Sequence, residues 1–307
     1  MSEVSHVGML RGGVGTTARV RSYLADLSRS FSVTLLTAAT LVVSAAAIPA
    51  HANPPAQQPA AQQPAACKAP RDLVRLTMPL VAAQAAMARD GEFRVVALGS
   101  SSTQGAGASS PKMCYPAQLE AELNRRFHPE KQFEVANLGV GGEMSSDMLA
   151  RLDRDVLPLK PDLVIWQTGV NDALYARPLD EFRMELAQGI DAIRATGADV
   201  ILLDLQYFPK SERVDGYKDY LHTMWTVAQE KAVPVLRRHA FMKHLVDSRQ
   251  FTAAQLLAPD LFHLNDLSYR CLGNLVADAI GDGLEQAGRI VQRNKSAAVS
   301  YPPAGRN

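Results

Sequence analysis

The fold is decided by the stretch FRVVALGSSST, which spans residues 93–103. Its first part, Phe93 to Leu98, is short and mostly apolar, and a glycine and a row of hydroxyl side chains follow it. A run of this kind is typical of a strand that is buried on both faces of a parallel sheet. Comparable runs occur at residues 133–137, 162–167, 199–203 and 233–236. We therefore predict a five-stranded sheet whose first strand ends at Gly99.

Helical periodicity fills the intervals between the predicted strands. Helices are expected at residues 71–91, 116–127, 144–156, 180–195, 214–231 and 266–286. Pro116 suits the first turn of its helix, because its missing N–H would have no partner there. The alternation of strands and helices favours right-handed βαβ units, a parallel sheet and helices on both of its faces. The predicted fold class is α/β, with a ligand site beyond the carboxyl ends of the strands.

Four short stretches meet that expectation, because each follows a predicted strand or precedes the last helix. They are GSSST at 99–103, NLGVGG at 137–142, GVND at 169–172 and DLFH at 260–263. Each alone is a weak signal, since Gly-Ser and Asn-Asp pairs usually form turns and a lone histidine is usually structural. Their order and spacing along one α/β pattern are far more specific.

With these motifs, residues 93–287 resemble the SGNH hydrolase superfamily, also called the GDSL esterases and lipases. The four letters stand for serine, glycine, asparagine and histidine, one from each stretch. The resemblance implies a three-layer α/β/α sandwich with a flavodoxin-like parallel sheet. It also assigns the site residues: Ser101 as nucleophile, Gly142 and Asn171 as members of the oxyanion hole, His263 as base and Asp260 as its carboxylate partner.

These residue types suit the cleavage of a carboxylic ester through an acyl-enzyme. A serine hydroxyl becomes a good nucleophile when a base takes its proton, and an imidazole can accept that proton and return it to the leaving alkoxide. Asp260 would hold His263 in the required tautomer. The N–H groups of Ser101 and Gly142 and the side-chain amide of Asn171 would stabilise the oxyanion. This chemistry needs no metal ion and no cofactor.

Neighbouring residues offer alternatives, and the chain departs from the family pattern at three positions. Ser100 and Ser102 flank the nucleophile, and they replace the aspartate and leucine of the Gly-Asp-Ser-Leu form. Leu264 stands where a proline often follows the histidine. Gly141 competes with Gly142, although the Asn-x-Gly-x-x-Gly register favours Gly142. Three further histidines lack a D-x-x-H partner and are expected to be surface or packing residues: His222, His239 and His244.

The first quarter of the chain differs in composition from the rest. A basic segment, an uncharged run at 31–50 and an A-x-A-type cleavage site predict a signal peptide over residues 1–52, with an uncleaved membrane anchor as the alternative. The Pro-, Gln- and Ala-rich segment 53–66 cannot form a core and is typical of a flexible spacer. We expect the hydrolase domain at 67–292 and a polar, frayed tail at 293–307.

Export would place the chain in an oxidising compartment, where disulfides persist. A helix from residue 71 that packs antiparallel to the first strand would bring Cys67 to the carboxyl end of the sheet. Cys114 lies just before the helix that leaves the same end. We therefore expect a Cys67–Cys114 disulfide, with Cys271 as a buried thiol in the last helix.

Four loops are expected to shape the substrate site, at residues 103–114, 143–147, 173–180 and 206–217. Tyr207 and Phe208 lie in the last of these loops, where they suit lining of the site and ordinary packing equally well. Asp172 is expected to brace the turn at Asn171 rather than to react.

The 307 residues carry a formal net charge of +1, which argues against a nucleic-acid-binding surface. We expect an exported (periplasmic or secreted) monomeric serine esterase, without a stable membrane span after signal cleavage. Its substrates would be small-molecule or polysaccharide esters, with short acyl or carbohydrate O-acetyl groups preferred, since no long apolar lid is evident. Lysophospholipase, thioesterase and O-acyltransferase activities would use the same residues and stay open. A non-catalytic module that binds a surface polymer is the alternative from another class.

Overall fold

The computed structural model describes residues 67–300, with side chains described as far as Arg293. The predicted signal peptide at 1–52 and spacer at 53–66 lie outside the described residues. The fold therefore concerns the expected hydrolase domain and the part of the chain that directly follows it.

In the described residues, five parallel strands form a sheet with the order β2-β1-β3-β4-β5. The strands are β1 (Phe93–Gly99), β2 (Phe133–Gly139), β3 (Leu163–Gln167), β4 (Asp199–Leu203) and β5 (Val235–Leu236). β3 is buried throughout, and β1 is buried except at Arg94. These two strands form the centre of the core. This strand order is the flavodoxin-like one. The predicted parallel five-stranded sheet is confirmed.

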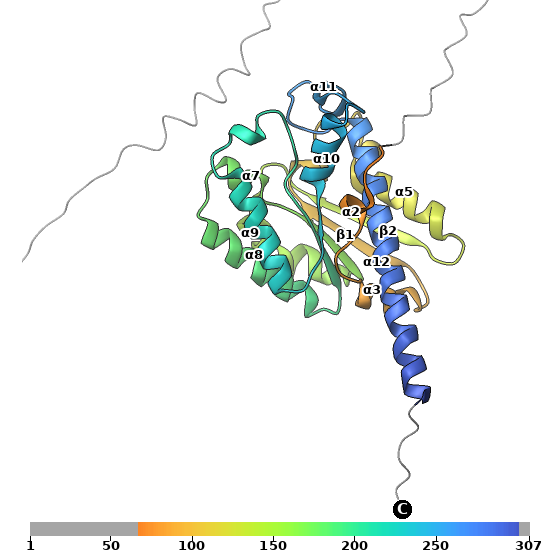
Figure 1. Cartoon of the computed structure of the whole chain (residues 1–307). Coiled ribbons are helices and arrows are strands. Elements are labelled where there is room, and N and C mark those ends of the chain that lie inside the picture. The colour runs from red at the N-terminus through yellow and green to blue at the C-terminus, as the bar shows by residue number, and fades with distance from the viewer. Residues whose placement is uncertain (1–66, 301–307) are drawn as a thin grey trace, which may run out of the picture. The chain divides into compact units, whose positions relative to one another are not determined.

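Helices cover both faces of the sheet and complete a three-layer α/β/α sandwich (Figure 1). Figure 1 shows α8 and α9 on one side of the sheet and α5 and α12 on the other. The helices are α2 (Arg71–Val74), α3 (Val81–Met87), α4 (Ser101–Gln104), α5 (Tyr115–Phe127), α6 (Ser145–Ala150), α7 (Val170–Leu174), α8 (Leu179–Arg194), α9 (Tyr217–Glu230), α10 (Arg238–Asp247), α11 (Ala253–Leu256) and α12 (Asp266–Ser300). Short 3-10 or π turns are η1 (Pro111–Met113), η2 (Leu152–Val156), η3 (Leu157–Leu159) and η4 (Ser211–Arg213).

The segment between Arg71 and Gly91 departs from the single helix expected there. α2 ends at Val74, and α3 begins only at Val81. Pro79 explains the break, because proline has no N–H to donate and disfavours helical geometry in the residue before it.

Three other elements differ from their predicted form. The helix expected at 144–156 consists of α6 followed by the π turn η2, and α10 and α11 have no predicted counterpart. α12 continues to Ser300, so the frayed tail expected from residue 293 is wrong for its first residues. Ala297 and Ala298 fall in this extension, and alanine is the best helix former.

The carboxyl ends of the central strands lie next to one another. The register pairs Gly99 of β1 with Gly139 of β2 and Leu98 of β1 with Trp166 of β3. The backbone N–H of Val140 then donates to the carbonyl of Gly99 at 2.9 Å, which keeps the two strands together beyond their last residues. The motifs that follow these strands therefore start from one edge of the sheet.

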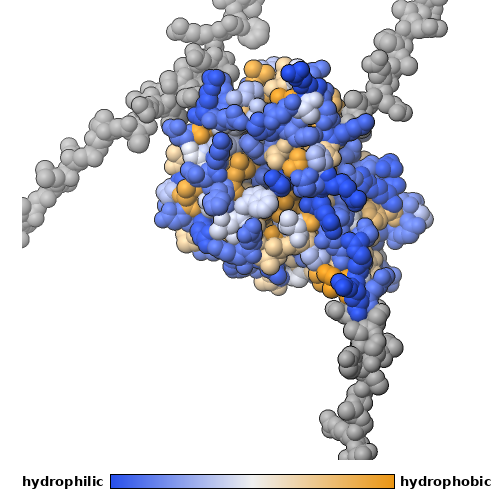
Figure 2. Space-filling model, viewed as in Figure 1, coloured by the Kyte–Doolittle hydropathy of each residue, from blue (hydrophilic) through white to orange (hydrophobic). Residues whose placement is uncertain are grey.

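Hydrophilic side chains cover most of the molecular face in Figure 2, with apolar residues scattered between them. Three of the exposed large apolar residues belong to segments that follow strands or precede α12: Val140, Tyr175 and Leu261. No helix among residues 67–300 combines the length and the apolar character needed to cross a bilayer.

The cysteines pair differently from the prediction. Cys67 forms a disulfide with Cys271, with their Cα atoms 5.7 Å apart, so both the Cys67–Cys114 bond and the free Cys271 thiol are wrong. The reason lies in α2, which packs against α12 and so brings Cys67 beside the first turns of that helix.

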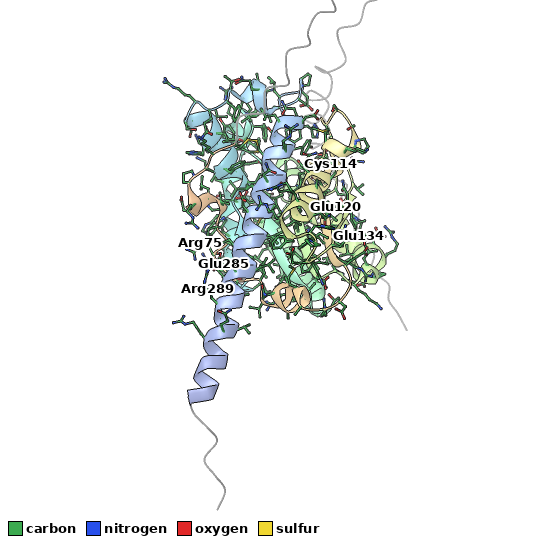
Figure 3. The ribbon with its side chains drawn as sticks, turned by 90° about the vertical axis from the view of Figure 1, so that its right-hand side faces the viewer. Arg75, Cys114, Glu120, Glu134, Glu285 and Arg289 are labelled. Atoms are coloured by element: carbon green, nitrogen blue, oxygen red, sulfur yellow. A yellow bond between two sulfur atoms is a disulfide. The ribbon has the colours of Figure 1, made fainter. Side chains whose placement is uncertain are left out.

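Cys114 remains a buried free thiol at the start of α5. Its Sγ donates to the carbonyl of Pro111 at 2.9 Å and accepts from the amide of Asn137 at 3.5 Å. Figure 3 shows Cys114 on the α5 side of α12. Cys114 therefore lies near the carboxyl end of the sheet, as predicted, but it is not bonded to Cys67.

The disulfide closes a long loop, since its cysteines are 204 positions apart. Replacing both Cys67 and Cys271 by serine should lower the free energy of unfolding by about 2–5 kcal/mol, because the unfolded chain regains loop entropy. Urea denaturation with and without a reductant measures this. The matched control is Cys114→Ser, which should still lose stability on reduction; a reductant-insensitive Cys114→Ser variant would contradict the pairing.

Candidate active site

Ser101 lies in the first turn after β1, where the strand passes directly into the short helix α4. Gly99 makes this turn possible, because a Cβ there would collide with the side chain of Thr103. Gln167, at the end of β3, holds the turn from the neighbouring strand. Its Oε1 accepts from the backbone N–H of Ser100 at 3.1 Å and from the hydroxyl of Thr103 at 3.0 Å. Ser101 is left half-buried at the carboxyl edge of the sheet.

His263 connects Ser101 to Asp260. Its Nε2 lies 3.0 Å from Ser101 Oγ, and its Nδ1 lies 2.6 Å from Asp260 Oδ2. The other carboxylate oxygen of Asp260 accepts from the backbone N–H groups of Phe262 and His263, each at 3.0 Å. The fold thus brings the three predicted triad residues into one continuous hydrogen-bond relay.

The turn that carries His263 is closed without the proline common in the family. Leu264 is buried and forms an antiparallel bridge with Leu257. The carbonyl of His263 accepts from the N–H of Ala258 at 2.8 Å. Leu264 therefore anchors the turn through packing and backbone pairing.

The electrostatics of the relay favour an ionised Asp260. Partial burial would raise the pKa of this carboxyl, but the hydrogen bonds from the His263 side chain and from the backbone of Phe262 and His263 outweigh that effect and lower the pKa. An ionised carboxylate only accepts hydrogen bonds, so Nδ1 of His263 carries a proton and Nε2 is the ring nitrogen that faces the hydroxyl of Ser101.

Asn171 contacts the segment that follows Gly142, and the loop of Gly141 and Gly142 borders Ser101. The Nδ2 of Asn171 donates to the carbonyl of Glu143 at 2.7 Å, and its second hydrogen stays available. An ideal Cβ built on Gly141 would lie 3.9 Å from the Cβ of Ser101, which places this loop next to the nucleophile. In the described part of the chain, no protein acceptor takes the backbone N–H of Ser101 or Gly142. The three predicted oxyanion donors are therefore open to a ligand.

Two buried carboxylates, Asp172 and Glu185, connect the helices next to Asn171. Asp172 accepts from the N–H of Ser145 at 3.2 Å and from its hydroxyl at 2.5 Å. The hydroxyl of Ser145 also lies 2.5 Å from Glu185, which is ion-paired with Arg177 at 2.7 Å. These contacts connect α6, α7 and α8. Asp172 thus holds α6 through Ser145, whereas the sequence indicates a brace for the turn at Asn171.

The other histidines named above are surface or packing residues, since His222 is exposed and His239 packs against an aromatic ring. His222 and His244 lie on α9 and α10, outside the relay. His239 packs edge-on against the ring of Tyr207 at 5.6 Å, and burial lowers its pKa to about 4. Phe208 is buried and packs edge-on against Phe262 at 5.0 Å. For Phe208, the packing interpretation is the correct one.

Two buried glutamines beside the relay have no counterpart among the predicted site residues. Gln167 closes the third strand, and Gln206 follows the fourth strand by three positions. Both are fully buried. A buried polar residue at the carboxyl end of an apolar strand is unusual, and that position is the signal that could have marked them.

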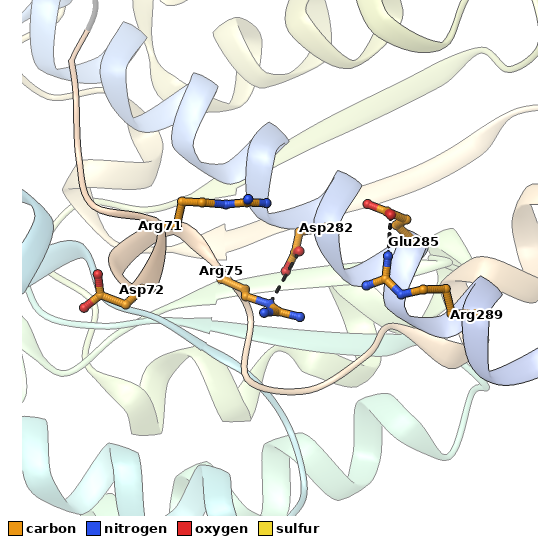
Figure 4. A pocket seen from close by; sticks show the side chains of 6 residues that line it. All are labelled: Arg71, Asp72, Arg75, Asp282, Glu285 and Arg289. Atoms are coloured by element: carbon orange, nitrogen blue, oxygen red, sulfur yellow. Dashed lines mark hydrogen bonds and ion pairs between the residues drawn. The ribbon is translucent and has the colours of Figure 1, made fainter.

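A charged hollow of about 350 Å³ lies away from the relay, between α2 and α12 (Figure 4). Its side chains pair with one another, as Arg75 does with Asp282 at 3.7 Å and Arg289 with Glu285. Figure 3 shows Arg75, Glu285 and Arg289 along α12. None of the relay residues lines this hollow. Within the residues whose side chains are described, no group of three or more His, Cys, Asp or Glu is arranged to hold a metal ion.

The backbone at Gly142 yields a test of the loop beside Ser101. Gly142 has a φ of 84°, a left-handed conformation that costs an L-residue about 1–2 kcal/mol. Gly142→Ala should therefore lower the free energy of unfolding by about 1–2 kcal/mol in urea denaturation. The control is Gly281→Ala, in the interior of α12, where an added Cβ meets nothing within 4 Å. That control should raise stability by about 0.5–1 kcal/mol; equal effects of the two variants would contradict the conformation assigned to Gly142.

Comparison with known proteins finds relatives and structural neighbours that are named as esterases and hydrolases. Esterase TesA of Pseudomonas aeruginosa is 35% identical over 90 residues, which cover 29% of this chain and 45% of that protein. The chain thus spans about half the length of this curated relative. A hydrolase from the metagenome of Lake Arreo, LAE5, superposes with a TM-score of 0.53 and 26% identity, covering 64% of this chain and 98% of that one. A two-domain esterase active on acetylated mannans shares the fold at a TM-score of 0.56 and 21% identity, covering 70% and 55%.

The family assignment rests on a longer match than any of these. Residues 66–286 match the family described as non-GDSL lipase-like. The description agrees with the Gly-Ser-Ser-Ser sequence at 99–102, which has Ser100 in place of the aspartate of the Gly-Asp-Ser-Leu form. The chain therefore belongs to the non-GDSL lipase-like family, within the SGNH hydrolase superfamily.

Proposed function

We propose that the protein is an exported serine esterase that cleaves carboxylic esters through an acyl-enzyme on Ser101. The observation that carries this proposal is the relay from Ser101 Oγ through His263 to Asp260, with distances of 3.0 Å and 2.6 Å. Membership of a hydrolase family adds to it. A serine hydroxyl with an imidazole nitrogen at hydrogen-bond distance is equipped for nucleophilic attack on an acyl carbon.

Acylation proceeds in two proton transfers. Ser101 Oγ attacks the carbonyl carbon while His263 Nε2 takes the hydroxyl proton, and the positive imidazolium is stabilised by ionised Asp260. The tetrahedral intermediate then breaks its bond to the alcohol oxygen, and His263 returns the proton to that oxygen. Water repeats the sequence on the acyl-enzyme and releases the carboxylic acid.

The oxyanion of the intermediate is bound by the N–H groups of Ser101 and Gly142 and by the Asn171 amide. The Asn171–Glu143 bond at 2.7 Å supports this arrangement, because it orients the amide before substrate arrives. Donors that are already oriented cost no reorganisation during the reaction, and each is worth about 2.7–4 kcal/mol of barrier.

We propose short acyl esters as the preferred substrates, including O-acetyl groups on carbohydrates. The exposed backbone of Gly141 and Gly142 borders the nucleophile, so a small acyl group on a bulky alcohol can approach from solvent. The two-domain structural relative is described as active on acetylated mannans, but its sequence identity of 21% supports only a shared fold. The preference here therefore rests on the open surface at the two glycines.

Export is supported by the sequence of residues 1–52 and by the disulfide. Cys67 lies just after the Pro-, Gln- and Ala-rich spacer and is bonded to Cys271. Structural disulfides persist in the periplasm and outside the cell, and are rare in a reducing cytosol. A periplasmic or secreted location agrees with a polymer-bound or small-molecule ester substrate.

A series of p-nitrophenyl esters from acetate to palmitate tests the activity and the acyl preference together. The purified protein should hydrolyse the acetate and butyrate esters fastest, because short chains need no long apolar tunnel. Ser101→Ala should lower kcat by about 10⁶-fold, since within residues 67–293 only the Ser101 hydroxyl is hydrogen-bonded to His263 Nε2. Undiminished turnover by Ser101→Ala would refute the nucleophile, and a rate that climbs steadily to palmitate would refute the short-acyl preference.

Asp260→Asn tests the carboxylate separately. The asparagine preserves the size of the side chain but favours the wrong tautomer of His263, so kcat should fall by about 10⁴-fold. The hydrogen bonds from His263 and the backbone keep the pKa of the wild-type carboxyl below its ordinary value, so the wild-type protein should lose the contribution of Asp260 only in acid, where the carboxyl takes up a proton. A variant that retains the wild-type kcat on p-nitrophenyl acetate would contradict the assignment.

A further inference from the structure

Gln206 lies between the two halves of the relay. It follows β4, is fully buried, and comes from neither the nucleophile motif nor the histidine motif. Two hydrogen bonds hold the backbone of this segment. The hydroxyl of Tyr217 donates to the carbonyl of Gln206 at 2.6 Å, and Nε of Arg238 donates to the carbonyl of Asp204, two positions earlier, at 2.8 Å. The side chain therefore starts from a rigid position.

The amide of Gln206 makes two hydrogen bonds in opposite directions. Its Oε1 accepts from the hydroxyl of Ser102 at 2.7 Å, and its Nε2 donates to the carbonyl of Phe262 at 2.8 Å. Ser102 follows the nucleophile Ser101, and Phe262 precedes the base His263. One side chain thus links the nucleophile helix α4 to the loop that carries the base.

The peptide unit between Phe262 and His263 is held at both of its polar atoms. Gln206 binds its carbonyl at 2.8 Å, and Asp260 binds its N–H at 3.0 Å. A peptide plane held in this way cannot rotate freely, and its orientation sets the direction in which the Cβ of His263 leaves the backbone. That direction decides whether Nε2 reaches Ser101 Oγ.

We propose that Gln206 is a positioning residue of the catalytic relay, which fixes the distance between Ser101 and His263 without contacting substrate. This inference rests on the proposed serine-esterase function. Gln167 differs from Gln206, because the hydrogen bonds of its side chain hold Ser100 and Thr103 on the nucleophile side only. A misplacement of about 1 Å in a catalytic group costs about 10²-fold in rate.

Two substitutions separate positioning from packing. Gln206→Met preserves the length of the side chain and removes both hydrogen bonds, and it should lower kcat by about 10–100-fold with KM unchanged. Gln206→Glu has the same shape, and its protonated carboxyl can accept from Ser102 and donate to Phe262, whereas the ionised form cannot donate. Burial raises the pKa of such a carboxyl, so both forms are accessible near neutral pH.

The pH profile is the readout that a packing role would not move. The rate of Gln206→Glu divided by the wild-type rate should rise as the pH falls, because protonation restores the missing donor. The same ratio for Gln206→Met should not change with pH. The matched control is Ser211→Ala, which removes a buried hydrogen bond of 2.6 Å to the carbonyl of Phe208 in the same segment but leaves both side-chain hydrogen bonds of Gln206 in place, and which should retain wild-type kcat.

Labelling of Ser101 by a fluorophosphonate distinguishes this proposal from the esterase proposal. In that reaction the Ser101 oxygen bonds to phosphorus, fluoride leaves, and His263 takes the hydroxyl proton, so no ester substrate is needed. Slower labelling of Gln206→Met supports positioning even if no tested ester is cleaved, in which case only the proposed function fails. Wild-type labelling and kcat in Gln206→Met, or parallel pH profiles of Gln206→Glu and wild type, would overturn the positioning role. A folded wild-type protein that neither cleaves esters nor is labelled would overturn both proposals.

Discussion

Parallel pairing of β1 with both β2 and β3 is the constraint on which the rest of the molecule depends. In a parallel sheet, all strands end at the same edge, and the segments that follow them must leave from that edge. The pairing therefore gathers Ser101, Gly142 and Asn171 from separate parts of the chain. α12 then packs across one face and, through the turn before it, brings His263 to the same edge.

Buried polar side chains behind the site hold its segments in fixed positions through hydrogen bonds. Gln167, Gln206 and Asp172 each make hydrogen bonds to a different strand, helix or loop from their own. Buried polar groups without partners are costly, so each of these side chains is held in the arrangement that satisfies it. The reacting groups at the surface of the edge are thereby supported by a rigid network beneath them.

Much of this site was predictable, and the failures have physical reasons. Ser101, Asp260 and His263 were predictable because their short motifs resemble those of a known family; the serine motif follows an apolar run, and the histidine motif precedes the last helix. The disulfide was not, because the expected helix from residue 71 breaks at Pro79 and α2 packs on α12, which takes Cys67 to Cys271. Gln206 was not, because a single glutamine carries no motif and its two partners lie 104 and 56 positions away.

The sequence by itself determined the α/β class, the strand positions, the motif residues and the family resemblance, since these depend on local periodicity and on short fixed spacings. Only the tertiary structure decided which cysteines pair and which buried amides hold Ser101 and His263 in place. Those features depend on contacts between segments distant in the chain. The packing of the whole domain selects such contacts, and no local sequence pattern predicts them.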